Sequence, residues 1–424
     1  MVTEESISFR EYFKKSKLLQ FGFVFNLISL TSVASVFIYL TLIGSVDTTV
    51  YSMDFQVFYE SGQAFLSSPD SIYTVNPNGL PYRYLPIFAA VMSVFVGVPL
   101  SILYLLNITM MTVLHLCTVY LVFRVSFEIG VTTATKNFEK TLTIVAITPP
   151  HVVNLILGQI SQLVILLLLV ALFILLHSPK ESYAPFLLVG ILIGIASTLK
   201  PFCLVFIPFL IPLTIIGRSN LSLPLKPFFG IFSGLFLSMS PNLLYFITYP
   251  STINEFLQVN LAEGLATHHS TSITKLVMVL LPFVNSQLLM FSIIILLGGL
   301  IFLRSYITFV RDDGERKNYT HYFTEVMFFL LLAYPDSWFL FIAFLYAFLA
   351  PSMLRLYRFD GAFRYLDVLW DGANNLMAFF SLGIVIHYLF LGFDPINPIW
   401  IATLYVLYHR LYRNSTKSNS MADH

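Results

Sequence analysis

The fold class of this chain is decided by residues 159–177, which read QISQLVILLLLVALFILLH. The stretch holds no Asp, Glu, Lys or Arg. As an α-helix it would be about 28 Å long, close to the ~30 Å of hydrocarbon in a bilayer. Other apolar runs of roughly 17 to 25 residues recur along the chain. Because a backbone in lipid must satisfy its own hydrogen bonds, such runs predict membrane-spanning helices rather than barrel strands.

The composition places the whole chain in the membrane. Of its 424 residues, 57% are hydrophobic and 11% are charged, whereas soluble domains carry roughly 25% charged residues. The polar interruptions between the apolar runs are too short to fold around a core of their own. We therefore expect an all-α, polytopic transmembrane bundle that forms one integral-membrane domain over residues 1–424. The net charge of +1 argues against a nucleic-acid partner.

Clusters of Lys and Arg set the expected orientation, because basic residues concentrate in cytoplasmic connections. If the clusters of this chain are cytoplasmic, both termini lie inside and about twelve spans result. The predicted spans run near residues 19–46, 101–124, 141–157, 159–177, 183–199, 201–217, 228–248, 286–304, 321–335, 337–355, 374–393 and 395–412.

The same alternation assigns the rest of the chain. The segments are a cytoplasmic N-terminus (1–18), a first outer loop (47–82), a second outer loop (249–274) and a polar C-terminal tail (413–424). Two apolar pieces, 84–99 and 273–285, are left without a crossing, and we expect re-entrant or surface helices there. A crossing by residues 84–99 would invert the parity of every later span.

A consequence of this alternation is that the unusual polar residues share the non-cytoplasmic face. They are Asp54, Arg83, the Gly158-Gln159 turn, Lys200, the run His268-His269-Ser270-Thr271-Ser272 and the turn Pro335-Asp336-Ser337-Trp338. We therefore expect groups that carry charge or form hydrogen bonds to face one aqueous cavity.

Asp54 and Lys200 stand out in this set, and each has an ordinary structural alternative. Asp54 lies in the polar stretch MDFQVFYESGQA, residues 53–64, where it could equally be a plain loop acid or the N-cap of a helix. Lys200 lies between two apolar runs, and ionisable groups at membrane depth are usually retained for a partner or a substrate. Its alternative is snorkelling to the interface.

His268 and His269 could suggest a metal site. Zinc is disfavoured, because the only acid close to them in the sequence is Glu263 and no cysteine stands at a ligand spacing.

The order of several motifs resembles the GT-C superfamily of integral-membrane glycosyltransferases. The motifs are Asp54-Phe55-Gln56-Val57-Phe58-Tyr59 with Gly62 after it, Ile72-Tyr73, Tyr82-Arg83-Tyr84-Leu85-Pro86, Pro149-Pro150 before Gly158-Gln159, Gly190 to Lys200-Pro201, and Pro335-Asp336-Ser337-Trp338. Within the superfamily the chain is most similar to glycosyltransferase family 87, the polyprenyl-phosphate-mannose-dependent α-mannosyltransferases. The resemblance covers roughly residues 50–340.

The resemblance implies positions for the site residues. It implies a catalytic acid in a short first outer loop, which maps onto Asp54, and a lysine at the position of Lys200. It also implies a Gly-Gln turn at Gly158-Gln159 and a later polar loop, which residues 268–274 resemble.

The chain departs from the pattern of the family at two places. Trp338 is followed by Phe339 and Leu340, whereas the family commonly has a histidine there. The entry to the next helix, Tyr84-Leu85-Pro86, has one proline where two are more usual.

The chemistry of transfer from a lipid phosphate fits these residue types. A base must take the proton of the acceptor hydroxyl, and an Asp of ordinary pKa ~3.9 such as Asp54 is ionised at neutral pH. The departing phosphate needs cationic hydrogen-bond donors. The candidate donors are Lys200 and Arg83, with His268 and His269 behind them, and the candidate residues of the substrate groove are Tyr59, Tyr84, Gln159 and Trp338.

The resemblance implies transfer of a hexose, mannose being the commonest, from a polyprenyl-phosphate donor to a lipid-linked or glycan acceptor. The reaction would occur on the non-cytoplasmic face of the cell membrane, or of the endoplasmic reticulum in a eukaryote. A divalent cation stays open as a cofactor, although Asp54, Glu60 and Asp70 alone do not make a convincing site. Two other functions remain open: a lipid or solute transporter or flippase, and a non-catalytic partner of a glycosylation complex.

Overall fold

The computed structural model describes residues 8–46, 49–135, 137–179, 181–216, 224–262, 270–281, 286–311, 315–335, 337–356, 398–399, 401–410 and 412. Over these residues the protein is all-helical, with 82% helix and no strands. One isolated antiparallel β-bridge joins Ser270 to Trp338. The expectation of an all-α fold is therefore confirmed.

Five helices in the described part of the chain are long and apolar enough to cross a membrane. They are α2 (Lys17–Leu42), α5 (Leu100–Glu128), the pair α6 (Phe138–Ala146) and α7 (Pro149–Leu157), α11 (Leu225–Thr248), and α14 (Ser286–Ser305) with the start of η7 (Tyr306–Arg311). Shorter apolar helices are α8 (Ser161–His177), α9 (Tyr183–Leu199), η4 (Pro201–Val205) with α10 (Phe206–Leu213), and α16 (Ile342–Leu356). The count of about twelve spans stays a prediction, because residues 374–393 lie outside the described residues.

The two apolar pieces that were expected not to cross form short helices. These are α4 (Pro86–Ser93) and α13 (Ile273–Leu280), of eight residues each. Eight helical residues reach roughly 12 Å, well below the thickness of the hydrocarbon. At α4 the chain leaves the helix through turns over residues 94–98 and starts α5 at Leu100.

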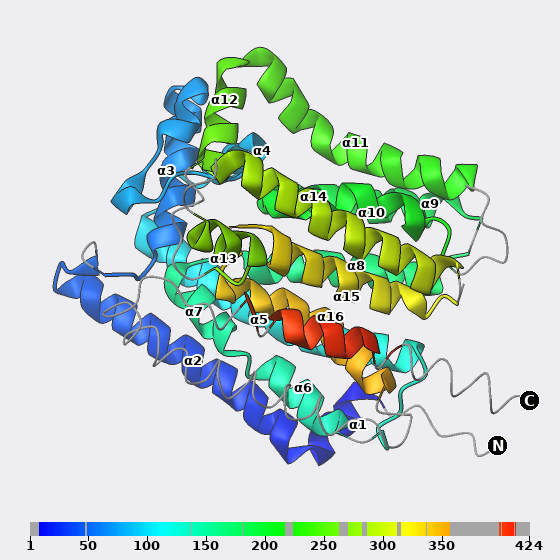
Figure 1. Ribbon diagram of the computed structural model, residues 1–424. Coiled ribbons are helices and arrows are strands. Elements are labelled where there is room, and N and C mark those ends of the chain that lie inside the picture. The colour runs from blue at the N-terminus through cyan, green and yellow to red at the C-terminus, as the bar shows by residue number, and fades with distance from the viewer. Residues whose placement is uncertain are drawn as a thin grey trace, which may run out of the picture.

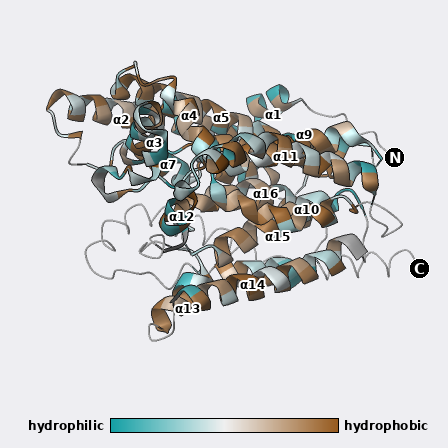
Figure 2. Cartoon of the chain, turned by 90° about the horizontal axis from the view of Figure 1, so that it is seen from above, coloured by the Kyte–Doolittle hydropathy of each residue, from teal (hydrophilic) through white to brown (hydrophobic). Residues whose placement is uncertain are grey.

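The helices of the bundle run side by side, and its two ends differ (Figure 1). The connecting helices α3 (Met53–Ser67), α4, α12 (Ser251–Leu257) and α13 gather at one end, and α1 (Phe9–Lys15) lies at the other. We call these the α3 end and the α1 end. Hydrophobic residues cover most of the bundle, whereas hydrophilic ones are frequent on α3 and α12 (Figure 2).

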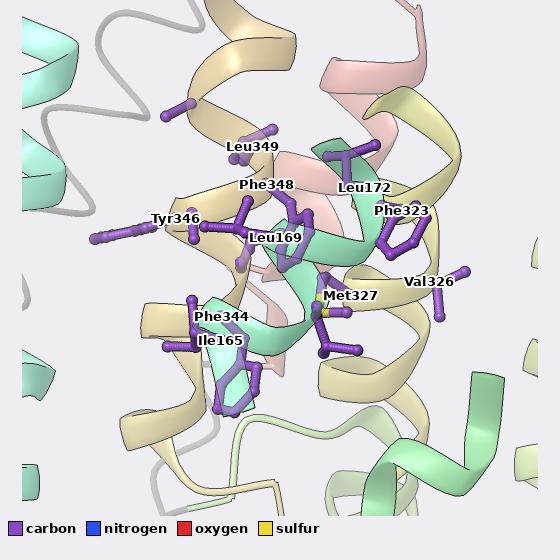
Figure 3. Packing of buried hydrophobic residues seen from close by; sticks show 14 of the residues in the cluster. Ile165, Leu169, Leu172, Phe323, Val326, Met327, Phe344, Tyr346, Phe348 and Leu349 are labelled. Atoms are coloured by element: carbon purple, nitrogen blue, oxygen red, sulfur yellow. The ribbon is translucent and has the colours of Figure 1, made fainter. Parts of the chain in front are cut away.

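The centre of the bundle is α15 (Asn318–Ala333), in which every residue is buried. Phe323 and Met327 on this helix meet Leu169 of α8 and Phe348 of α16 (Figure 3). The rings of Phe323 and Phe348 are stacked, with their centroids 5.6 Å apart. The peripheral spans are α2 and α14, which are only 22% and 17% buried inside the protein and so leave most of their apolar surface to lipid.

Helices α9 and α11 pack backbone against backbone. Gly190 and Gly194 on α9 lie against α11, and Gly230 and Gly234 on α11 lie against α9. A Cβ atom added at Gly190 would lie 2.0 Å from the carbonyl oxygen of Ile231, so a side chain cannot fit there. This is the small-residue packing of membrane helices.

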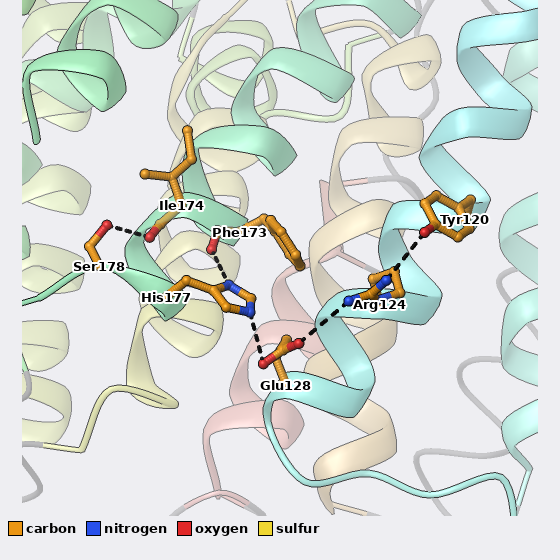
Figure 4. A network of polar contacts seen from close by, with 7 residues as sticks. All are labelled: Tyr120, Arg124, Glu128, Phe173, Ile174, His177 and Ser178. Atoms are coloured by element: carbon orange, nitrogen blue, oxygen red, sulfur yellow. Dashed lines mark hydrogen bonds and ion pairs between the residues drawn. The ribbon is translucent and has the colours of Figure 1, made fainter. Parts of the chain in front are cut away.

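The α1 end carries a partly exposed charge network. The carboxylate of Glu128, at the end of α5, pairs with Nε2 of His177 on α8 at 3.0 Å and with Arg124 at 3.9 Å (Figure 4). Phe9 of α1 packs on Phe123 one turn earlier in α5, which places the network at this end. Exposed ion pairs contribute about 0–1 kcal/mol, so the network contributes little to stability.

Candidate active site

Asp54 lies at the start of a helix at the α3 end. Ser52 adopts the left-handed conformation, with φ of 59°, and donates its backbone N–H to the carbonyl of Ile156 at 2.8 Å. Helix α3 starts directly afterwards, so Asp54 stands in its first turn, where the unpaired N–H groups favour a negative charge. Its side chain is half-buried.

The segment predicted as the first outer loop, residues 47–82, is largely helical. Helix α3, η2 (Pro69–Thr74) and η3 (Pro77–Gly79) occupy most of it. Asp54 is also not an N-cap, because Ser52 holds that position. The helix fixes the direction in which the acid projects.

The Gly158-Gln159 turn meets α3 from the other side. Gly158 ends α7 with φ of +77°, a conformation that favours glycine. A Cβ atom there would lie 2.5 Å from Cβ of Phe55, so the turn also needs glycine to approach α3. Asn107 of α5 donates to the carbonyl of Gly158 at 3.0 Å and holds the turn in place.

Gln159 bridges Asp54 and Lys200. Its Nε2 donates to Oδ2 of Asp54 at 2.7 Å, and its Oε1 accepts from Nζ of Lys200 at 2.5 Å. The orientation of the amide is fixed, because a carboxylate accepts and an ammonium donates. The acid, the amide and the lysine come from α3, the α7–α8 turn and the end of α9.

Lys200 enters this network from the C-cap of α9. Its ammonium donates to the hydroxyl of Tyr84 at 3.1 Å as well as to Gln159. The same nitrogen lies 5.0 Å from the ring centroid of Tyr84 and 5.3 Å from that of Phe341, within the range of cation–π attraction. The side chain is only 5% exposed. The snorkelling alternative therefore fails, since Lys200 points into the protein.

Tyr84 forms the wall beside the lysine. Its hydroxyl also lies 3.5 Å from Oε1 of Gln159, and its carbonyl accepts from the hydroxyl of Tyr73 at 3.1 Å. Burial, and next the charge of Asp54, raise the pKa of Tyr84 well above its ordinary value. The phenol therefore keeps its proton in the pH range where enzymes work, and it can present that proton to an anion.

The sequence also predicted Tyr59, Arg83, His268 and His269 as site residues. The hydroxyl of Tyr59 donates to the carbonyl of Val96 at 2.9 Å, in the turns after α4. Arg83 is half-buried next to Tyr84, and its charge lowers the pKa of that tyrosine, against the larger effects of burial and Asp54. His268 and His269 lie outside the described residues.

Trp338 is half-buried and forms the β-bridge with Ser270. Around this bridge, Thr271 donates its N–H to the carbonyl of Ser337 at 2.7 Å. The hydroxyl of Ser270 donates to the carbonyl of Pro335, also at 2.7 Å. Two polar runs that were predicted to share one face are therefore bound to each other. Three residues after Trp338, Phe341 contacts the lysine.

Phe341 is a site residue that the sequence did not reveal. It lies in η8 (Phe339–Phe341), within an aromatic-rich apolar run, and nothing in the sequence separates it from packing residues. As for metals, no three His, Cys, Asp or Glu side chains converge within the described residues. Glu60 accepts from Gln56 and Asp70 from Ser68, so these two acids serve local contacts.

The comparison with protein families bears on the same segments. The family description "Glycosyltransferase family 87" matches residues 82–335, which is more than half of the chain and includes Tyr84, Gln159 and Lys200. Asp54 precedes the matched segment. No match was found among curated proteins or among solved structures. The extent of the family match, over a helical membrane bundle, establishes that the chain belongs to glycosyltransferase family 87 and is a membrane glycosyltransferase.

Proposed function

We propose that this protein transfers mannose from a polyprenyl-phosphate donor to a lipid-linked or glycan acceptor on the non-cytoplasmic face of its membrane. The family gives the reaction class. The observation that carries the proposal is the chain of contacts from the Asp54 carboxylate through the Gln159 amide to the Lys200 ammonium. It holds a base and a cation at a fixed separation, as group transfer to a hydroxyl requires.

In the proposed reaction, Asp54 takes the proton of the acceptor hydroxyl as that oxygen attacks the anomeric carbon of the sugar. A carbon–oxygen bond forms there, and the bond from the anomeric carbon to the phosphate oxygen breaks. The electron pair of that bond stays on the phosphate, which leaves as polyprenyl phosphate. Lys200 stabilises the additional negative charge.

The burial of Lys200 suits it to this role. At 5% exposure it is held away from bulk water, so its attraction to a phosphate is screened less than that of an exposed lysine. The rings of Tyr84 and Phe341 attract the ammonium and so hold its direction. The Tyr84 hydroxyl, which keeps its proton, is a second donor for the same phosphate.

The isoprenoid tail of the donor needs an apolar surface. A cavity of about 470 Å³ lies between α13 and the helical residues 401–410, and Ile273, Leu276, Ala402 and Val406 are among the residues that line it. It adjoins the Ser270 and Thr271 contacts beside Trp338, because α13 follows them directly in the chain. We assign the first isoprene units of the donor to this cavity.

The test is sugar transfer by the purified protein from radiolabelled polyprenyl-phosphate-mannose to a membrane lipid extract. Asp54→Asn should lower the rate by roughly 10²- to 10⁴-fold, the usual contribution of a general base. Glu60→Gln is the matched control, since Glu60 lies on the same helix and accepts only a local bond from Gln56. If wild-type protein transfers nothing from any polyprenyl-phosphate sugar, the proposal fails, and a transporter or an inactive partner of a glycosylation complex becomes the better interpretation.

A further inference from the structure

Asn242 is a buried amide in the last two turns of the apolar helix α11. It is 1% exposed and directly follows Pro241. Both ends of its side chain are used. Oδ1 accepts from the backbone N–H of Ile87 at 3.0 Å, and Nδ2 donates to the hydroxyl of Thr198 at 2.9 Å.

The two partners of Asn242 belong to the segments that carry the site. Ile87 is three residues after Tyr84, and Thr198 is two residues before Lys200. A third contact joins the same segments directly, because Leu85 donates its N–H to the carbonyl of Thr198 at 3.4 Å. One side chain from α11 thus ties the first turn of α4 to the last turn of α9.

Asn242 also terminates the close packing of α9 and α11. The α11 residues Gly230, Gly234, Ser238 and Asn242 follow one another at intervals of four, which places them on one face of the helix. The first two approach the α9 backbone too closely for any side chain, and the hydroxyl of Ser238 lies where a Cβ on Gly194 would be. The glycines set the distance between α9 and α11, and Asn242 links this packed pair of helices to the site segments by its hydrogen bonds to Ile87 and Thr198.

We propose that Asn242 is a positioning residue that holds Lys200 and Tyr84 at the separation needed to bind the donor phosphate. The inference rests on the proposed function, in which these two groups face that phosphate. Asn242 touches neither the network nor the substrate, and it acts through the backbone of both segments. Displacements of about 1 Å in such groups can lower rates by about 10²-fold.

The test compares steady-state kinetics of Asn242→Leu, Thr198→Val and Thr198→Ser. Leucine keeps the number and branching of the side-chain heavy atoms of Asn242 and removes both hydrogen bonds. Valine keeps the shape of Thr198 and removes its hydroxyl, whereas serine keeps the hydroxyl. We expect the KM for the polyprenyl-phosphate sugar to rise roughly tenfold in the first two variants and to stay within about twofold of wild type in Thr198→Ser. The KM for the acceptor should not change, because Asp54 is carried by α3.

Ser238→Ala is the matched control. Ser238 lies one turn before Asn242 on the same face, but its hydroxyl bonds only to the carbonyls of Gly234 and Leu235 in its own helix. A merely structural role for Asn242 would reduce the amount of active protein, and so lower kcat without changing either KM. That result, or an equal rise of the donor KM in Ser238→Ala, would overturn the inference.

Hydrogen–deuterium exchange gives a readout that does not depend on activity. The amide of Ile87 should exchange faster in Asn242→Leu than in wild type and in Ser238→Ala. Absence of transfer by wild-type protein together with faster exchange would refute the proposed function and leave the contact of Asn242 established. Unchanged exchange at Ile87 in an active enzyme would refute the positioning role alone.

Discussion

Replacement of Gln159 by leucine, which has no hydrogen-bonding group, should uncouple the candidate base from the lysine. Gln159 is 8% exposed and forms one hydrogen bond to Asp54 and one to Lys200. Hydrogen bonds to ionised groups are worth about 1.5–3 kcal/mol each. Asp54 is half-buried, so water can replace the lost amide and most of that value is recovered. Lys200 is only 5% exposed, so water cannot replace the hydrogen bond that it loses.

The free energy of unfolding should therefore fall by about 2–3 kcal/mol, which is close to the value of the Lys200 bond alone. Sugar transfer should fall by roughly 10²-fold, because both charged groups lose their fixed direction. Unfolding can be followed by titration with dodecyl sulfate in mixed micelles, and transfer with radiolabelled donor under saturating acceptor.

Gln162→Leu is the matched control for this experiment. Gln162 is an equally buried amide, three residues later on α8, and it lies against His115 rather than in the network. Its replacement should leave transfer within about twofold of wild type, because the partners of Gln159 are untouched. Equal losses of transfer in the two variants would show that a buried amide near the turn matters for folding and that the bridge to Lys200 does not matter for catalysis.

Three further predictions concern the turn, the donor tail and pH. Gly158→Ala should abolish most transfer, because it combines left-handed strain of about 1–2 kcal/mol with a contact of 2.5 Å to Phe55; Gly79→Ala, with φ of +78° and open space around it, has the strain alone and should retain transfer. Leu276→Trp should fill the apolar cavity and raise the KM of long-chain donors more than the KM of short-chain donors. Leu288 is 68% exposed, so Leu288→Trp should change neither KM. An equal KM for long-chain and short-chain donors in Leu276→Trp would contradict the assignment of the tail. Burial raises the pKa of Tyr73, Tyr82 and Tyr84 above the ordinary tyrosine value, so above pH ~10 the unfolded chain loses protons that the folded chain keeps. The free energy of unfolding should then fall as pH rises, by up to about 1.4 kcal/mol per pH unit for each tyrosine. In the variant with Tyr73, Tyr82 and Tyr84 all replaced by phenylalanine, unfolding titrations should show a smaller fall over the same pH range.

The positions of the helices could be predicted well from hydropathy, because long apolar runs in a membrane have few alternatives to helix. The spans predicted at 159–177 and 183–199 correspond to α8 and α9, whose bounds are Ser161–His177 and Tyr183–Leu199. The span predicted at 141–157 is divided, because Pro149 starts a new helix after Thr148. The polar segment 47–82 contains α3, and its position outside the membrane stays a prediction.

The convergence of Asp54, Gln159 and Lys200 could also be predicted, because the alternation of basic clusters assigns all three to the same side of the membrane. Polar side chains at one end of an apolar bundle can find partners only among one another or in water, and the hydrogen bonds of these three residues confirm the convergence. Their roles in catalysis stay predictions. Tyr59, five residues after Asp54 on the same helix, projects about 140° away from it, and its place in the substrate groove stays a prediction.

Contacts between helices were beyond the sequence. Phe341 and Asn242 reach the site region through the packing of one helix on another, which the order of apolar residues does not specify. A lone asparagine in an apolar helix was a signal for Asn242, because an amide in lipid must find a partner.

The glycine contacts between α9 and α11 have a consequence for the entropy of substrate binding. Glycine has no rotamers, so the close approach at Gly190 and Gly234 leaves no side-chain freedom to be lost at that surface. The last turn of α9 takes its final position when the protein folds, and the Cα atom of Lys200 is positioned with it. A ligand that reaches the lysine therefore meets a scaffold already ordered, and more of its contact energy remains available for affinity.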